Sequence, residues 1–413
     1  MIPVDQAALH LDGFGPLPIK KPDSIANLGE LIREAAAANQ AIYPISGRTH
    51  LDLGGIPSKP GWAIDLAGLD EIIDFPARDM TVTCRPGITL ASLQATLAKE
   101  NLRLPIDVPR PETATLGGAI AANISGPRRF GCGTLRDYVI GISAVNDEGR
   151  EFKAGGRVVK NVAGYDICKL LVGSLGTLGV VSQVTLKLRP LAEEQVLVTV
   201  ACPTEKLAGL LEKLHGSATR PVIVEVVNRA GGGLVFPAVH HPFPDADWLL
   251  LVGYEGNSDA VKWQMQQIVK ELSPGFPIDA RLGFCAAAID RALVEWPAWP
   301  TAAVTLKACV VPGATAELLS TIENRREGWL LQAHAGNGII FAHRDRKASA
   351  AEIAAIRAST ASLGGMLTVS RCPSLLKREI EVWGPPPKEI AVMRRVKELF
   401  DPRRLFNPGR FIE

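Results

Sequence analysis

Residues 173–180, which read GSLGTLGV, carry three glycines at spacings that suit a nucleotide ligand. A glycine lets the backbone approach a ligand closely, because no Cβ blocks the approach and positive φ angles are accessible. Here the glycines follow a helical pattern at 165–172 and precede a β-rich run at 180–188. The dinucleotide fingerprint of a Rossmann unit needs the order strand, glycines, helix. The observed order argues against an NAD site and predicts a different nucleotide cradle.

Two further segments have the composition of cofactor loops. Residues 43–55 read YPISGRTHLDLGG, a short β-like run that opens into a polar loop with glycines. Residues 104–126 read LPIDVPRPETATLGGAIAANISG, a proline-rich stretch that leads into a small-residue helix. Backbone N–H groups at such a helix start are natural partners for a pyrophosphate. The phosphate candidates are Thr115, Gly117, Gly118 and Ser125, with Pro109 shaping the approach.

The set of loops, in this order, resembles the PCMH-type FAD-binding fold of the vanillyl-alcohol-oxidase-like flavoproteins. Within that family the motifs are most similar to those of a flavin-binding subunit of bacterial glycolate oxidase. The motifs that carry the resemblance are ATLGGAIAANISGPRRFGCGTLRD (114–137), VVKNVAGYD (158–166), GSLGTLGV (173–180) and FDPRRLFNPGRF (400–411). The resemblance implies one FAD, bound at Gly47, Arg48, Thr49, His50, Leu51, Pro109, Thr115, Leu116, Gly117, Gly118, Ser125, Gly173, Ser174, Gly176, Thr177, Gly179, Val180 and Asn407.

The first loop departs from the family pattern at Arg48. The family usually reads close to Arg-Gly-Gly-Gly-Thr, whereas this chain has Ser46 in place of the arginine and Arg48 and Thr49 in place of glycines. Arg48 therefore adds bulk and charge where backbone groups usually suffice. His50 falls where some relatives carry a histidine bonded covalently to the flavin, and imidazole is a competent nucleophile. The glycine context of those relatives is absent, so we expect non-covalent FAD and a hydrogen-bonding His50.

The segment HAGNGIIFAH, which begins at His334, is the first catalytic candidate. Active 2-hydroxy-acid dehydrogenases of the resembled family carry His-x-Gly-Asp-Gly-Asn-x-His, close to substrate and often to a metal. Here Asn337 replaces the acid, Ile340 or Phe341 takes the place of the second histidine, and His343 is displaced. Two imidazoles at strand spacing can bind a metal, but the broken pattern predicts a degenerate site without one.

Arg128, in the pair Arg128-Arg129, is the second catalytic candidate. A planar guanidinium suits a carboxylate substrate. Paired arginines also occur at solvated or interfacial positions, and both interpretations stay open here. The catalytic base is therefore not assigned from the sequence.

Composition limits the functional classes. A chain of 413 residues predicts two domains, and a net charge of +2 gives no general attraction to nucleic acid. No apolar run approaches the roughly 20 residues that span a bilayer, and the N-terminus shows no secretory signal. We expect a cytoplasmic protein, or one held at the inner membrane through partners. The cysteines are scattered without any CxxC, so an iron–sulfur cluster would belong to another subunit.

The pattern of elements predicts an α+β protein. Helical spacing at 24–39 and 90–100, with β-like runs between and after them, indicates a PCMH-type FAD-binding domain over 1–190. Repeated β-α-β units over 191–385 predict a ferredoxin-like cap or substrate domain, with its unit duplicated. Residues 386–413 are expected to form a helix and tail that return to the FAD domain.

The resemblance implies a function as well as a fold. The first hypothesis is the FAD-binding subunit of a glycolate (2-hydroxy-acid) oxidase complex, with a sister flavoprotein subunit and an iron–sulfur subunit as partners. A second is an assembly subunit that binds no flavin. A third is a stand-alone FAD oxidoreductase for another 2-hydroxy acid such as D-lactate. The sequence leaves open which subunit removes the hydride.

Overall fold

The computed structural model describes residues 8–156, 166–235, 244–298 and 301–412. By their internal contacts the residues form two compact units. Unit 1 comprises 1–124, 134–190 and 385–413, and unit 2 comprises 125–133 and 191–384. The motif at 158–166 and the start of the helix expected from residue 165 fall, except for Asp166, outside the described residues.

Unit 1 contains two main sheets. One has the order β1-β2-β4-β3, with β2, β3 and β4 parallel. The other is antiparallel, with the order β5-β6-β10-β8-β9. Their bounds are β1 Ala8–Leu11, β2 Phe14–Lys20, β3 Ala41–Ile45, β4 Gly61–Asp65, β5 Ile72–Asp74, β6 Thr81–Cys84, β8 Val139–Val145, β9 Glu151–Gly155 and β10 Val180–Lys187. A short pair, β7 (Leu102–Arg103) and β11 (Arg189–Pro190), completes the strands described in this unit.

The helices α1, α2 and α3 of unit 1 begin at side-chain caps provided by Ser24, Thr89 and Thr115. Ser24 Oγ accepts a hydrogen bond from Asn27 N (3.1 Å) and so caps α1. Leu28 and Ile32, one turn apart on this helix, are fully buried, as the helical period requires. The helices are α1 Ile25–Ala37, α2 Leu90–Ala98, α3 Leu116–Ala122, α5 Leu135–Tyr138, α6 Cys168–Leu171 and α14 Ile390–Phe400.

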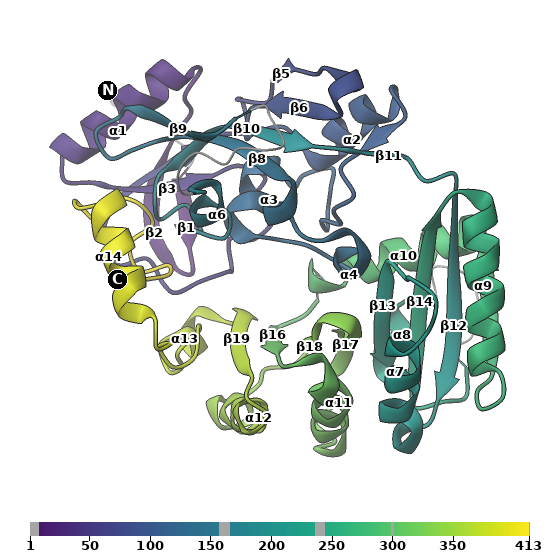
Figure 1. Cartoon of the computed structure of the whole chain (residues 1–413). Coiled ribbons are helices and arrows are strands. Elements are labelled where there is room, and N and C mark those ends of the chain that lie inside the picture. The colour runs from purple at the N-terminus through teal and green to yellow at the C-terminus, as the bar shows by residue number, and fades with distance from the viewer. Residues whose placement is uncertain (1–7, 157–165, 236–243, 299–300, 413) are drawn as a thin grey trace. The chain divides into compact units, whose positions relative to one another are not determined.

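The C-terminal segment packs on the N-terminal strands of unit 1. Ile42 N donates to Leu405 O (2.7 Å) and Asn407 N donates to Ile42 O (2.9 Å), so residues 405–407 pair with β3 in parallel. Figure 1 shows the yellow C-terminal segment beside the purple strands. Phe406 is fully buried in the core with Ile42. The tail therefore closes the exposed edge of β3, directly before the first predicted cofactor loop.

Unit 2 is built on one eight-stranded antiparallel sheet of order β15-β12-β14-β13-β17-β18-β16-β19. Each half follows the path β-α-β-β-α-β, and the two halves join along β13 and β17. The predicted duplication of a ferredoxin-like unit is thus confirmed. The strands are β12 Glu194–Cys202, β13 Ile223–Asn228, β14 Trp248–Gly256, β15 Ile278–Leu282, β16 Val304–Cys309, β17 Leu330–His334, β18 Ile339–Arg344 and β19 Met366–Arg371.

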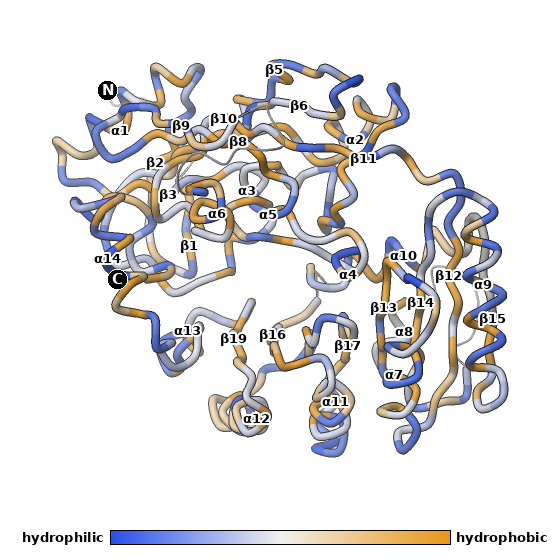
Figure 2. The backbone as a smooth tube through the Cα atoms, in the orientation of Figure 1, coloured by the Kyte–Doolittle hydropathy of each residue, from blue (hydrophilic) through white to orange (hydrophobic). Residues whose placement is uncertain are grey.

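Both faces of this sheet are covered by apolar packing. On one face the helices between strands supply the larger core, which includes Leu210, Ile268, Leu318 and Ile353. On the other face α8 and α10 enclose a smaller core around Trp296. Figure 2 shows hydrophobic colour concentrated along β12, β13 and β14, as expected for strands buried on both sides. The helices are α4 Arg129–Cys132, α7 Leu207–His215, α8 Arg229–Val235, α9 Ser258–Leu272, α10 Gly283–Glu295, α11 Thr315–Asn324, α12 Ala350–Ser362 and α13 Ser374–Lys377.

The predicted α+β class is confirmed, with differences in detail. Residues 125–133 belong by their contacts to unit 2 rather than to the first domain. The reason is local: Gly131 N donates to Val222 O (3.1 Å), and an added Cβ at Gly131 would lie 2.6 Å from Val222 Cα. The insertions α8 and α10 were not predicted. Within the described residues, no helix combines the length and the apolar character that crossing a bilayer requires.

Candidate functional site

The loops predicted to hold a cofactor meet in a groove of unit 1. The groove consists of two adjoining cavities with shared walls. The residues that line both are Pro44, Ile45, Ser46, Gly118, Ala121, Leu175 and Asn407. An elongated, continuous groove of this kind suits an extended dinucleotide.

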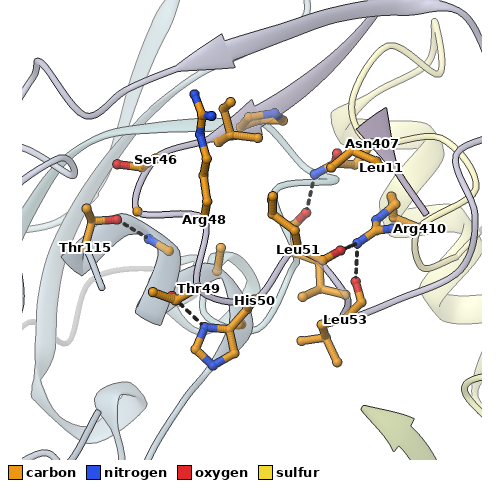
Figure 3. Close-up of a pocket in the computed structure, with 17 residues that line it drawn as sticks. Leu11, Ser46, Arg48, Thr49, His50, Leu51, Leu53, Thr115, Asn407 and Arg410 are labelled. Atoms are coloured by element: carbon orange, nitrogen blue, oxygen red, sulfur yellow. Dashed lines mark hydrogen bonds between the residues drawn. The ribbon is translucent and has the colours of Figure 1, made fainter. Parts of the chain in front are cut away.

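The first wall is the loop that follows β3. A Cβ at Gly47 would lie 1.9 Å from Thr113 O, so only glycine permits this approach of the two loops. Arg110 Nη2 donates to Thr49 O and ties the same loops together. Thr49 Oγ1 and His50 Nδ1 are 2.9 Å apart, and Figure 3 marks this contact with a dashed line. The loop is therefore anchored from behind, and its residues 47–51 line the groove.

The second wall is the start of α3. Thr115 Oγ1 accepts a hydrogen bond from Gly118 N (3.4 Å) as the N-cap. Gly117 packs against Pro86, where a Cβ would come within 2.6 Å of the proline Cβ. At Gly118, in contrast, a Cβ would meet only Thr115 Oγ1, at 3.3 Å, and would project into the groove. Gly117 therefore allows close packing against Pro86, whereas Gly118 leaves space for a ligand in the groove.

The third wall is the glycine loop at 173–180. Gly176 has φ +64° and Gly179 has φ +145°, both in the region that favours glycine. Asn407 Nδ2 donates to Leu175 O (2.6 Å). This bond fixes the loop against the C-terminal segment, and Asn407 itself lines both cavities.

A buried lysine provides a second anchor for this loop. Lys397 Nζ donates to Thr177 O (2.8 Å) and to Phe406 O (3.0 Å), and it also bonds Asp401 Oδ2. Asp401, which is fully buried, accepts hydrogen bonds from Leu405 N and Phe406 N. One ion pair therefore joins the glycine loop to the tail. This pair was not predicted from the sequence; its signal was a lysine and an aspartate four residues apart at the end of α14.

Arg410 anchors the far end of the first loop. Its Nη1 donates to Gly55 O (2.8 Å) and to Asp12 Oδ2. Its Nη2 donates to Leu51 O and Leu53 O, which Figure 3 shows as dashed lines. Arg410 also was not predicted as a site residue. It belongs to the NPGRF motif, and only the fold shows where that motif lies.

The lining of the groove fits an anionic cofactor. No aspartate or glutamate lines either cavity in the part of the chain that the structure describes, whereas Arg48 and Arg410 do. The hydroxyl of Ser46 is buried without a hydrogen-bond partner in the protein, and a buried polar group of this kind is usually satisfied by a ligand or water. Open space beside Gly118, positive charge and a free hydroxyl together match a pyrophosphate and its sugar.

The predicted contact residues divide into two groups. Those that line the groove are Gly47, Arg48, Thr49, His50, Leu51, Thr115, Gly117, Gly118, Gly176, Gly179, Val180 and Asn407. Those that do not line it are Pro109, Leu116, Ser125, Gly173, Ser174 and Thr177. Leu116 is fully buried in the core, Ser125 falls in unit 2, and Thr177 bonds Ser174 O inside the glycine loop.

Comparison with known families decides the cofactor. Residues 16–155 match the family described as FAD binding domain, and residues 377–411 match the C-terminal domain of FAD linked oxidases. Residues 16–155 are accordingly an FAD-binding domain, and residues 377–411 resemble the C-terminal domain of the FAD linked oxidases. The two matched segments hold most of the groove, from β3 to α3 and from α14 to Arg410. FAD is accordingly the cofactor of this flavoprotein.

Individual flavoproteins are similar to this chain as well. A D-lactate dehydrogenase of Archaeoglobus fulgidus is 26% identical over 411 residues, which covers 95% of this chain and 91% of that protein. Glycolate oxidase subunit GlcE of Escherichia coli is 35% identical over 163 residues, 38% of this chain and 47% of that protein. The 4-ethylphenol oxidase of Gulosibacter chungangensis superposes with a TM-score of 0.72 at 14% identity, over 96% of this chain and 89% of that one. The last likeness concerns the fold alone.

In unit 2 of the flavoprotein, His334 has a partner that was not predicted from the sequence. His334 Nδ1 lies 2.5 Å from Glu225 Oε1, and Gln332 Nε2 donates to Glu225 Oε2 (2.7 Å). Glu225 and Gln332 are fully buried, and His334 is 1% exposed. The other ring nitrogen of His334 is buried without a protein partner. A single glutamate inside the apolar run VIVEVVN was the available signal.

His343 does not join His334. The ring of Phe341 lies between the two, 5.4 Å from the His334 ring and 6.4 Å from that of His343, centroid to centroid. His343 Nδ1 contacts Thr305 Oγ1 (2.9 Å). Burial, with a smaller effect from Arg371, lowers the pKa of His343 to about 3, so the ring is neutral. Among the described residues, no three His, Cys, Asp or Glu side chains are placed to share a metal ion.

Arg128 is held by two carboxylates of unit 2. Its Nε donates to Glu255 Oε2 (3.1 Å) and its Nη2 donates to Asp290 Oδ2 (2.7 Å). All three side chains are at most 12% exposed. A guanidinium with this pairing attaches residues 125–133 to the sheet, which accounts for their membership of unit 2. Of the two interpretations left open for Arg128, the structural one has the direct contacts.

Proposed function

We propose that this flavoprotein is the FAD-binding subunit of a complex that oxidises glycolate, or a related 2-hydroxy acid, and passes electrons to an iron–sulfur subunit. Two features, considered together, support the assignment. In unit 1 the predicted cofactor loops line one groove, whereas in unit 2 Ile340 or Phe341 takes the place of the second histidine of the active 2-hydroxy-acid dehydrogenases in the resembled family. The local similarity to a glycolate oxidase subunit points the same way.

The chain's own residues have distinct roles in this proposal. Gly118 and the loop 47–51 receive the pyrophosphate side of FAD, and Gly176, Gly179 and Asn407 receive the flavin side. Bound FAD supplies the acceptor for the hydride that leaves C2 of the hydroxy acid. Residues such as Thr177 and Gly173 shape the glycine loop from behind. We propose non-covalent attachment, since the glycine context of the covalent members of the resembled family is absent around His50.

A second candidate is a stand-alone oxidoreductase for a 2-hydroxy acid such as D-lactate. The Glu225–His334 pair favours it, because a carboxylate that orients an imidazole and leaves its other nitrogen available is a known arrangement for a general base. The match to a D-lactate dehydrogenase over nearly the full chain also favours it. A third candidate, an assembly subunit without flavin, conflicts with the complete groove.

One set of measurements separates the candidates. The purified full chain should show a flavin spectrum, and acid precipitation should release the colour into the supernatant. Glycolate or D-lactate should bleach that flavin slowly or not at all, and partner subunits co-purified from the host should restore turnover with a dye acceptor. Rapid bleaching of the lone chain would favour the second candidate, and a colourless chain that cannot be loaded with FAD the third. A fluorescent protein pellet would show a covalent flavin.

A further inference from the structure

Arg48 occupies a backbone position that an arginine rarely adopts. Its φ angle is +55°, a left-handed conformation that glycine takes without penalty. The resembled family has a glycine at this place. Arg48 lines the cavity formed by the first loop, and its side chain is 42% exposed. Arg110, Arg326 and Arg404 share this positive φ, so what sets Arg48 apart is a half-exposed, charged side chain in the lining of the groove.

The hydrogen bonds of Arg48 leave most of its donors available. Its Nη2 donates to Asp65 Oδ2 (3.0 Å), and this is its one recorded polar contact among the described residues. Asp65 sits at the end of β4 with a side chain 10% exposed. Its other oxygen accepts from Ala67 N (3.1 Å). A guanidinium carries five N–H donors in a fixed fork, so Asp65 holds one corner and leaves the other donors available to a ligand in the groove.

Arg410, the other arginine of the groove lining, is differently placed. Its guanidinium already bonds one carboxylate and three carbonyl oxygens. Figure 3 shows Arg410 directed toward Leu51 and Leu53, while Arg48 extends past Ser46, away from His50. Of the two arginines that line the groove, Arg48 is therefore the one whose N–H donors are available to bind an anion. A pyrophosphate is the anion that FAD brings.

We propose that Arg48 is a dedicated counter-charge for the FAD pyrophosphate, positioned by Asp65. The inference rests on the FAD contacts proposed above, and it extends them. Where the resembled family has a glycine, this chain adds a charged side chain in the same loop. The affinity for FAD therefore depends on a side-chain charge and on ionic strength.

The test is an FAD titration of the full chain after removal of its flavin, followed by quenching of flavin fluorescence at low and high KCl. Arg48→Gly should weaken FAD binding about ten- to a hundredfold at low salt, the range for loss of a hydrogen bond to a charged group. The same variant should also show a flatter salt dependence. Arg48→Lys should recover most of the affinity. The matched control is Arg136→Ala, which changes an exposed arginine of α5 outside the groove and should leave the FAD affinity unchanged.

Two outcomes would overturn the proposal. One is an Arg48→Gly protein that binds FAD as tightly as the parent with the same salt dependence. The other is weakened binding that neither Arg48→Lys restores nor salt modulates, because loop shape rather than charge would then be responsible. Thermal unfolding of each flavin-free variant checks that the fold is retained. The titration uses neither substrate nor partner, so its failure is distinct from failure of the glycolate assignment.

Discussion

The cofactor groove of unit 1 and the histidine-bearing face of unit 2 use their residues in opposite ways. The groove presents backbone and glycine positions, and its charged residues Lys397, Asp401 and Arg410 act from behind as anchors. In unit 2 the polar side chains themselves face one another: Glu225 meets His334, and Thr305 meets His343. The first region depends mainly on shape, with Arg48 as the charged side chain proposed to meet the ligand, and the second depends on side-chain chemistry.

This difference predicts that the two regions respond differently to substitution. In the groove, Gly47 and the anchors define the space, and Arg48 stands where the resembled family has a glycine. In unit 2 the polar side chains themselves would carry any chemistry, so a single substitution would change it. The ring of Phe341 lies between the two histidine rings and separates them. The comparison can be tested from both sides.

The largest expected effect is at Gly118. In Gly118→Val the branched side chain would project into the groove on the proposed pyrophosphate path, and the purified protein should retain essentially no FAD. Flavin absorbance per chain measures the effect. Gly68→Val is the matched control, since a Cβ there meets nothing within 4 Å, and that variant should stay yellow. A stoichiometric flavin content in Gly118→Val would remove this residue from the site.

The next largest effect is expected at Lys397, which anchors the glycine loop to the C-terminal tail. Lys397→Met leaves Asp401 as a buried carboxylate without its cation, which costs about 3–5 kcal/mol for a broken buried pair. We expect a lower melting temperature of the flavin-free protein and loss of FAD on gel filtration. Arg395→Met, an exposed change two residues earlier on α14, is the control. If Lys397→Met kept both stability and flavin, the glycine loop would be independent of the tail, contrary to the first half of the comparison.

The features that the sequence predicted and the structure shows follow from local motifs. Ser24 as a cap, the turn between β8 and β9, and the order of the glycine loops each follow from neighbouring residues. The order β-α-β-β-α-β of the elements in unit 2 follows likewise from the local periodicity of apolar residues.

Other features depend on contacts between distant segments. Lys397 reaches Thr177 across 220 positions, and Glu225 reaches His334 across 109. No spacing rule relates such residues. Ser125 illustrates the limit most clearly: its motif is continuous with Gly118, yet the chain crosses to unit 2 between them, because Arg128 is bound by Glu255 and Asp290.

A smaller effect is expected in unit 2, where His343 should make the free energy of unfolding depend on pH. The folded-state pKa of His343 is about 3, below the usual value near 6.5 for an unfolded chain. Between these values the unfolded state binds a proton that the folded state does not, so the free energy of unfolding should fall as pH decreases from 6.5 toward 3. The slope contributed is at most about 1.4 kcal/mol per pH unit. Urea unfolding from pH 7 to pH 4 should show a shallower decline in His343→Gln, and an unchanged one in the exposed His215→Gln.

The smallest effect is expected for substitution of His334 in unit 2. Removal of a hydride from C2 leaves a hydroxyl proton that needs an acceptor within about 2.6–3.2 Å. In this chain the imidazole that could take it is 1% exposed and contacts Glu225, and the ring of Phe341 lies between it and His343. If a sister subunit carries the base, His334→Gln in the assembled complex should keep its activity within about tenfold. Glutamine preserves a hydrogen-bond donor for Glu225, so a fall in activity would not reflect an unpaired carboxylate. A decrease of more than about a hundredfold, the lower scale of general-base contributions, with FAD content and assembly intact, would show that the Glu225–His334 pair is a working base and that the side-chain chemistry of unit 2 is still in use.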